Sequence, residues 1–173
     1  IGGGATGCEF AYLYNAYGAQ VTMIELLPHL LPNEDEEVSQ QLERSFTEQG
    51  MTILTGAKVT GLTLNNGLAQ VAVETNKGEQ TVDCDRVLVA VGVQGNVESL
   101  GLDEVGVIID RGFISVDNQM RTSVPTISAI GDVTGKMLLA HVASAQGVMV
   151  AEHLAGQESP PIEYDLMPRA VYC

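Results

Sequence analysis

Ile1-Gly2-Gly3-Gly4-Ala5-Thr6-Gly7-Cys8-Glu9 opens the chain, and a short β-prone run, Val21-Thr22-Met23-Ile24-Glu25, follows it. The first run has the form G-x-G-x-x-G, and the second closes on a carboxylate eighteen residues after Gly7. This spacing is typical of the turn and the second strand of a βαβ unit that binds a dinucleotide. The two runs together therefore predict a dinucleotide site at the start of the chain.

Each position in the two runs has a physical role in such a site. Gly2 permits a tight turn, Gly4 lets the backbone approach a pyrophosphate, and Gly7 allows the helix to pack close to the sheet. The free N–H groups at the helix start would receive a phosphate. Glu25 would accept hydrogen bonds from the adenosine ribose and repel a 2′-phosphate. Since residues 26–31 contain no Arg, we expect NAD rather than NADP.

Glycine-rich runs also occur in plain turns, so the context of this one decides the interpretation. Residues 9–17 can form a helix that Gly18 ends, and Glu25 stands where the fingerprint requires it. A second apolar run, Arg86-Val87-Leu88-Val89-Ala90-Val91-Gly92, predicts a buried central parallel strand. Its last residue, Gly92, would mark the sheet edge where ligands of open α/β sheets bind.

Charge and composition limit the classes of partner. The chain has 173 residues, 45% of them hydrophobic, and a formal net charge of -14. That size suits one or two domains, and that charge argues against nucleic acid and anionic membranes. No apolar run is long enough to span a bilayer and no signal segment opens the chain. We expect a cytoplasmic protein, with an organelle matrix or stroma as the alternative.

Cysteine usage indicates reduced thiols. Cys8, Cys84 and Cys173 are odd in number and have neither metal-ligand nor C-x-x-C spacing, so we expect no metal site. Cys8 lies beside the glycine-rich turn, where the helix start could activate its thiol. A small buried filler is the interpretation we favour.

Further elements follow from local signals along the chain. Asn33 with the acids after it predicts a helix start, and Gly50 predicts its end. Asn65-Asn66-Gly67 predicts a hairpin with a type I′ turn between residues 59–64 and 68–75. Beyond a connection at residues 93–106, we expect strands at residues 107–110, 113–117 and 126–132. A helix over residues 141–154 should follow, ended by Gly156.

Four motifs, taken in order, resemble those of the flavoprotein pyridine nucleotide-disulfide oxidoreductases: residues 2–9, 89–92, 129–132 and 138–143. The resemblance implies an α/β fold, with a Rossmann-like three-layer NAD domain at residues 1–93 that lacks most of its first strand. It further implies the second half of a split FAD domain at residues 94–165, and the start of an interface domain, which mediates dimerisation, at residues 166–173. The chain would then be an internal fragment of a longer polypeptide.

The same resemblance assigns residues to cofactors. Glu9 would reach the nicotinamide end and Val59 would pack near the adenine; Asp132 would bind the flavin ribitol. Read without the resemblance, Glu9 is a helix-dipole acid, Asp132 an Asx-turn residue, and His141 a cap or surface residue. The full set of expected cofactor-binding residues is Gly2, Gly3, Gly4, Ala5, Thr6, Gly7, Cys8, Glu9, Glu25, Val59, Gly92, Asp132, Leu138, Leu139, Ala140 and His141.

The activity implied is oxidation of protein-bound dihydrolipoamide by NAD⁺, through a disulfide and FAD. It implies a homodimer, and as partner a lipoyl-bearing protein of a 2-oxo acid dehydrogenase or glycine cleavage complex. The family's redox cysteines and its His/Glu pair lie outside the stretch that the chain resembles, so we nominate no catalytic residue here. Alternatives are a glutathione or mercuric reductase, which Glu25 disfavours because those use NADPH, and an NAD-binding module without catalysis. Gln146 departs from the family, which usually has an acid at that position.

Overall fold

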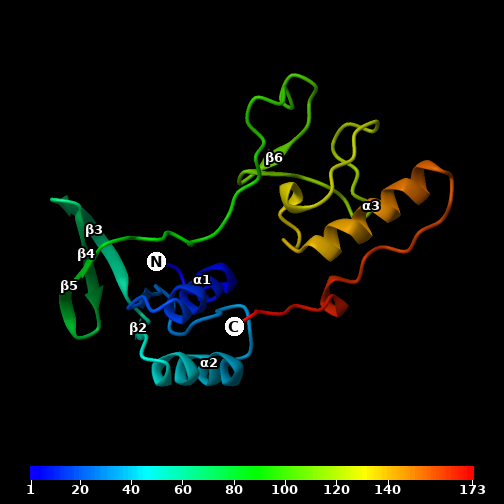
Figure 1. The fold of residues 1–173 in the computed structure, drawn as a ribbon. Coiled ribbons are helices and arrows are strands. Elements are labelled where there is room, and N and C mark those ends of the chain that lie inside the picture. The colour runs from blue at the N-terminus through cyan, green and yellow to red at the C-terminus, as the bar shows by residue number, and fades with distance from the viewer. The chain divides into compact units, whose positions relative to one another are not determined.

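The computed structural model describes residues 1–173 as a mixed α/β chain that forms two compact units (Figure 1). The first unit contains Ile1–Gly92 together with Ala170–Cys173, and the second contains Val93–Arg169. No helix combines the length and apolar character that crossing a membrane requires.

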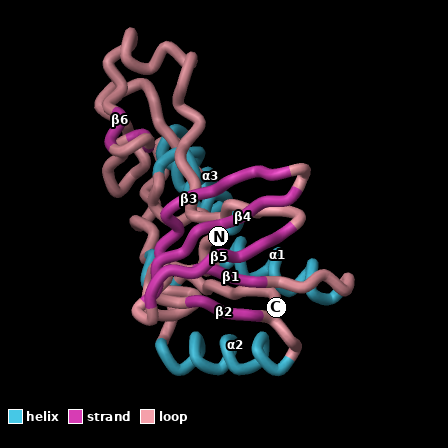
Figure 2. The backbone as a smooth tube through the Cα atoms, turned by 90° about the vertical axis from the view of Figure 1, so that its left-hand side faces the viewer, coloured by secondary structure: helices cyan, strands magenta, loops and turns pink.

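The first unit contains two helices and five strands. Its helices are α1 (Ala5–Ala16) and α2 (Glu36–Glu48). Strands β1 (Thr22–Ile24) and β2 (Thr52–Leu54) pair in parallel, and α2 lies against β2 (Figure 2). Strands β3 (Lys58–Asn65), β4 (Leu68–Thr75) and β5 (Gly78–Cys84) form an antiparallel sheet in that order.

Ile1 lies between β1 and the extended run at residues 86–92. Gly2 N donates to Ile24 O, and Ala90 N donates to Ile1 O. Ile1 N donates to Leu88 O at 2.8 Å, and Figure 1 shows the N-terminus beside this run. The lateral order is therefore β2, β1, residue 1, run 86–92. From residue 1 the chain first adds β1 and β2 on one side and later adds the 86–92 run on the other side. Such a reversal in the strand order is a switch point, where open α/β sheets bind ligands.

Residues 86–92 do not form the buried strand that we predicted. The run is extended but forms no regular strand, and Leu88, Val89 and Val91 are exposed. The physical reason is that the run has few backbone partners in the structure, two of its hydrogen bonds going to Ile1.

Helix α2 begins two residues later than we predicted. Asp35, not Asn33, is the N-cap, and its side chain accepts a hydrogen bond from Glu37 N at 2.8 Å. Either residue type can cap a helix, so the sequence alone favoured the first one in the chain. The helix buries Phe46 completely, and Gly50 follows it in the left-handed conformation at φ 88°, as predicted.

The predicted hairpin is confirmed. Asn65 pairs with Leu68, and Asn66 and Gly67 both have positive φ, as a type I′ turn requires. Strand β5 was not predicted, because residues 78–84 alternate weakly and carry mostly polar side chains. Its partner β4 supplies the buried face, where Val71 and Val73 pack with Ile24 and Ala57.

The second unit has less regular structure. It contains the short pair β6 (Ile109–Asp110) and β7 (Phe113–Ile114), the 3-10 helices η1 (Asp132–Thr134) and η2 (Tyr164–Leu166), and α3 (Ala140–Leu154). Helix α3 and the positive φ of Gly156 agree with the prediction. The predicted strand at residues 126–132 is wrong: only Ser128 makes a bridge, to Arg121, and Asp132 already starts η1.

Candidate dinucleotide site

The glycine-rich turn is shaped by two contacts that exclude a side chain. A Cβ atom on Gly7 would lie 2.0 Å from Gly2 O, and one on Gly2 would lie 2.2 Å from Ala90 O. Gly2 also has φ 103°, a conformation that L side chains rarely adopt. These two glycines therefore let α1 start directly against the first strand position.

Gly4 differs from its neighbours because the space beside it is open. A Cβ atom there would have no atom within 4 Å, and φ is -73°. Gly4 is the N-cap of α1, and no side chain caps the helix at this position. The N–H groups of Ala5, Thr6 and Gly7 have no partner within the helix, so they present a positive helix end to an open face. A diphosphate fits this arrangement.

Glu25 lies at the edge of the same turn, immediately after β1. Its side chain is buried, with 8% exposed. One carboxylate oxygen accepts from Gly3 N, and the other accepts from Leu27 N at 2.8 Å. A carboxylate has about four lone-pair positions, so two backbone donors leave capacity for the hydroxyls of a ribose.

Cys8 is fully buried in the first turns of α1, and its thiol donates to Gly3 O at 3.4 Å. Burial, together with the negative potential of Cys173, Glu25, Glu9 and Glu43, raises the pKa of Cys8 to about 12. The helix start therefore does not activate this thiol, and Cys8 packs with Leu30 and Phe46 as a small apolar filler.

The pKa of Cys8 predicts a pH dependence of stability. The unfolded thiol ionises near its ordinary value of 9.0, whereas the folded thiol stays protonated up to about 12. Between these values the unfolded state has lost a proton that the folded state keeps, so the free energy of unfolding falls as pH rises. We expect wild type to lose up to about 1.4 kcal/mol per pH unit more than Cys8→Ala in this window, measured by urea unfolding. Parallel pH profiles would contradict the assignment.

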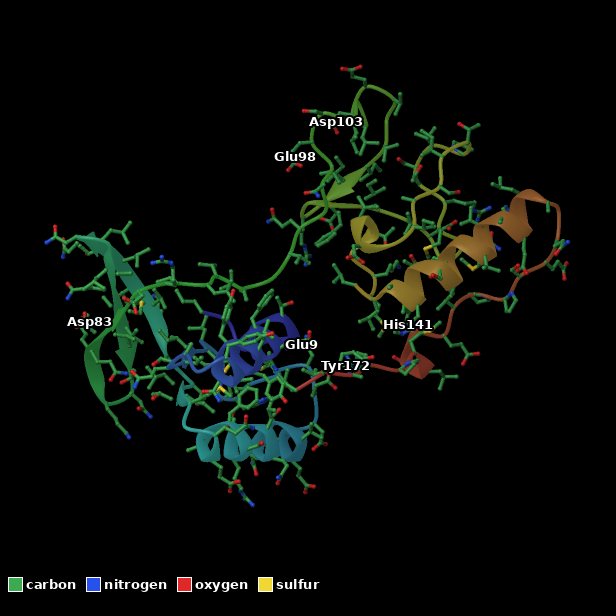
Figure 3. The ribbon with its side chains drawn as sticks, viewed as in Figure 1. Glu9, Asp83, Glu98, Asp103, His141 and Tyr172 are labelled. Carbon is green, nitrogen blue, oxygen red and sulfur yellow. The ribbon has the colours of Figure 1, made fainter.

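Glu9 and the end of the chain lie close together (Figure 3). Glu9 Oε1 accepts from Tyr172 N at 3.0 Å, and Val171 packs on the cluster that contains Cys8. Burial and the Glu9 charge raise the pKa of the Cys173 thiol. Val171 and Tyr172 thus contact α1 and the core cluster beside it.

Two other expected cofactor residues of the first unit, Val59 and Gly92, lie outside the glycine-rich turn in the sequence. Val59, on β3, packs against the cluster of Ile24 and Ala57, next to a bulge between Val59 and Gly61. Gly92 has φ 127°, and a Cβ atom on it would have no atom within 4 Å. The backbone at the end of the 86–92 run is therefore open on that side.

The expected flavin residues lie in the second unit. Asp132 is exposed and opens η1 after Gly131, whose φ is 76°. Leu139 is the N-cap of α3 without a side-chain cap, so the first N–H groups of α3 have no partner within the helix. His141 is exposed and its Nε2 lies 3.0 Å from Pro168 O. A helix start with open N–H groups suits the negative charge of a reduced flavin.

Sequence reasoning missed the supporting side chains. Gln146 is fully buried; its Oε1 accepts from Gly131 N at 2.6 Å, and its Nε2 donates to Tyr164 Oη at 3.1 Å. Glu43 Oε1 accepts from Leu30 N at 2.8 Å. His29 Nδ1 lies 2.9 Å from Leu30 O. Only the departure from the family pattern at Gln146 was a signal.

Known proteins resemble this chain over its whole length. A family model described as pyridine nucleotide-disulphide oxidoreductase matches residues 1–147. The dihydrolipoyl dehydrogenase of Chlorobaculum tepidum is 47% identical over 173 residues, covering 99% of this chain and 37% of that protein. That of Mycobacterium leprae is 47% identical over 175 residues, covering 100% of this chain and 38% of the relative.

Solved structures agree with the sequence comparisons. The crystal structure of LpdA from Mycobacterium tuberculosis matches with a TM-score of 0.89 at 34% identity, over 99% of this chain and 37% of LpdA. The flavoprotein disulfide reductase RclA from Escherichia coli, as a Cu(II) complex, matches with a TM-score of 0.82 at 27% identity, over 92% of this chain and 36% of RclA.

The chain therefore belongs to the pyridine nucleotide-disulphide oxidoreductase family. Within that family its similarity is to dihydrolipoyl dehydrogenases, which are flavoprotein disulfide oxidoreductases, and it spans 37% or 38% of the length of the two relatives named above. The predicted family is confirmed.

Proposed function

We propose that residues 1–93 bind NAD(H) in an enzyme that oxidises protein-bound dihydrolipoamide. The observation that carries this proposal is the open helix start at Gly4, held beside the buried carboxylate of Glu25. The N–H groups of Ala5 to Gly7 would hold the diphosphate, and Glu25 would accept from the adenosine ribose. Val59 would pack near the adenine, Glu9 would face the nicotinamide end, and Gly92 would leave room there.

We propose that residues 94–165 contribute to the FAD site. Asp132 would bind the ribitol, and the start of α3 with Leu138, Leu139, Ala140 and His141 would lie against the isoalloxazine. When bound, the flavin supplies the transfer of electrons between a dithiol and a nicotinamide. The chain's own residues bind and orient the two cofactors. Residues 166–173 would begin the interface domain of a homodimer, and the partner would be a lipoyl-bearing protein.

Disulfide reduction with NADPH, as in a glutathione or mercuric reductase, is the second candidate function, and RclA, which this chain resembles, is named a disulfide reductase. The Glu25 carboxylate argues against it, because it would repel a 2′-phosphate. Calorimetric titration of the intact protein with NADH and with NADPH tests the two. We expect tighter binding of NADH, and tighter binding of NADPH would overturn the proposed cofactor.

Gly4→Ala should affect nucleotide binding without affecting the stability of the fold. The added methyl group meets no atom of the protein, but it would stand where the diphosphate approaches the helix start. We expect the NADH affinity of the intact protein to fall at least about tenfold, while the free energy of unfolding changes by less than about 1 kcal/mol. Calorimetry and urea unfolding measure the two quantities. Unchanged NADH affinity would exclude this helix start as the diphosphate site.

A further inference from the structure

Residues 26–32, which lie between β1 and α2, have no regular structure, yet the N–H groups of Leu27, Leu30 and Leu31 have defined partners. Leu27 N donates to Glu25 Oε1 at 2.8 Å, and Leu31 N donates to Gly3 O at 2.7 Å. Between them, Leu30 N donates to Glu43 Oε1 at 2.8 Å. The segment is thus tied at one end to the proposed ribose carboxylate, at the other to the glycine-rich turn, and between these ends to α2.

The side chain of Leu30 packs close to Gly3. It is fully buried, and a Cβ atom on Gly3 would lie 2.6 Å from its Cδ2 atom and 3.1 Å from Glu25 Cβ. The side chains of Leu30 and Glu25 therefore both lie close to Gly3, so a shift of Leu30 changes the packing around the residue whose N–H the Glu25 carboxylate binds.

The backbone of the segment would not stay in this conformation on its own. Leu31 has φ 49°, a left-handed conformation that is unfavourable for a residue with a branched apolar side chain. Two side chains of α2 hold the segment: the Glu43 carboxylate at Leu30 N, and the Ser39 hydroxyl, which donates to Leu31 O at 3.4 Å. The carboxylate bond is the stronger one, because its acceptor is charged.

We propose that Glu43 is a positioning residue for nucleotide recognition. By holding Leu30 against Gly3, it fixes the Glu25 carboxylate on Gly3 N and Leu27 N, with its remaining lone pairs directed to the ribose hydroxyls. Glu43 itself touches no cofactor. The inference rests on the proposed NAD site and adds to it the residue that keeps Glu25 where its carboxylate selects NADH over NADPH.

A merely structural role for Glu43 would predict a different result. Loss of stability alone would weaken the binding of both nucleotides by the same factor. A positioning role weakens NADH more than NADPH, because a displaced Glu25 no longer binds the 2′-hydroxyl and also no longer repels a 2′-phosphate. The ratio of the two dissociation constants therefore distinguishes the roles.

The experiment compares four variants of the intact protein by titration with NADH and with NADPH. Glu43→Ala and Glu43→Met remove the acceptor, and Met keeps the length of the side chain. Glu43→Gln keeps an acceptor oxygen for Leu30 N. Glu48→Ala, an exposed site on the same helix, is the matched control for the lost charge.

We expect Glu43→Ala and Glu43→Met to weaken NADH binding about tenfold and to leave NADPH binding unchanged or slightly tighter. Glu43→Gln should stay within about threefold of wild type, and Glu48→Ala should equal it. If Glu43→Ala does not fold, the ratio in Glu43→Met decides. If the wild type binds NADH but the ratio of the NADH and NADPH dissociation constants is the same in the Glu43 variants as in the wild type, the role of Glu43 is overturned. If the wild type does not bind NADH, the proposed function itself is overturned.

Discussion

Gly7→Ala should lower the free energy of unfolding by more than about 4 kcal/mol and abolish NADH binding. The added Cβ would lie 2.0 Å from Gly2 O and 3.0 Å from Gly2 C. Both atoms belong to the backbone, so no side-chain rotation relieves the overlap. Helix α1 would have to move away from the first strand position, and its N–H groups would move with it.

Urea unfolding and calorimetry of the intact protein measure this effect, and Gly4→Ala is its control. The two positions differ by three residues in one turn, but only Gly7 is enclosed by backbone. We therefore expect loss of both stability and binding at Gly7, and of binding alone at Gly4. If Gly7→Ala is as stable as the wild type, α1 can shift without cost. The close packing of α1 against the first strand position would then not require a glycine at position 7.

The parts of the fold that were predicted correctly depend on local signals. Gly50 ends α2 and Asn66-Gly67 forms the type I′ turn because a positive φ is required at those positions. Glu25 closes β1 at the spacing that the G-x-G-x-x-G run predicted. At the two glycines the residue type and the backbone conformation are linked within a few residues, and at Glu25 the spacing of a known motif predicted the end of the strand, so no knowledge of the tertiary structure was needed.

The parts that could not be predicted depend on contacts between distant residues. The apolar runs at residues 86–92 and 126–132 predicted strands, but hydrophobicity does not specify a pairing partner. The first run bonds mainly to Ile1, and in the second only Ser128 makes a bridge. Likewise no pattern shows that Glu43 bonds Leu30 N, since the two are thirteen residues apart on different elements.

Gln146 provides the second large expected effect, because its amide connects three elements of the second unit. Its oxygen accepts from Gly131 N, directly before Asp132, and its nitrogen donates to the hydroxyl of Tyr164 in η2. The Tyr164 hydroxyl in turn lies 4.0 Å from Met120 Sδ. Since Gln146 has no exposed surface, water cannot replace its bonds after substitution without entering the core.

Gln146→Leu keeps a similar volume and removes both hydrogen bonds. It leaves Gly131 N without its acceptor, so we expect a loss of about 2–4 kcal/mol in the free energy of unfolding, measured by urea unfolding. Gln146→Glu retains an acceptor for Gly131 N and for the Tyr164 hydroxyl, and should lose less than half as much. Equal losses in the two variants would mean that packing, not hydrogen bonding, makes Gln146 important. A larger loss in Gln146→Leu would instead show that the amide holds Gly131, directly before Asp132. The FAD site proposed above then predicts that FAD retention by the intact protein falls in the same order.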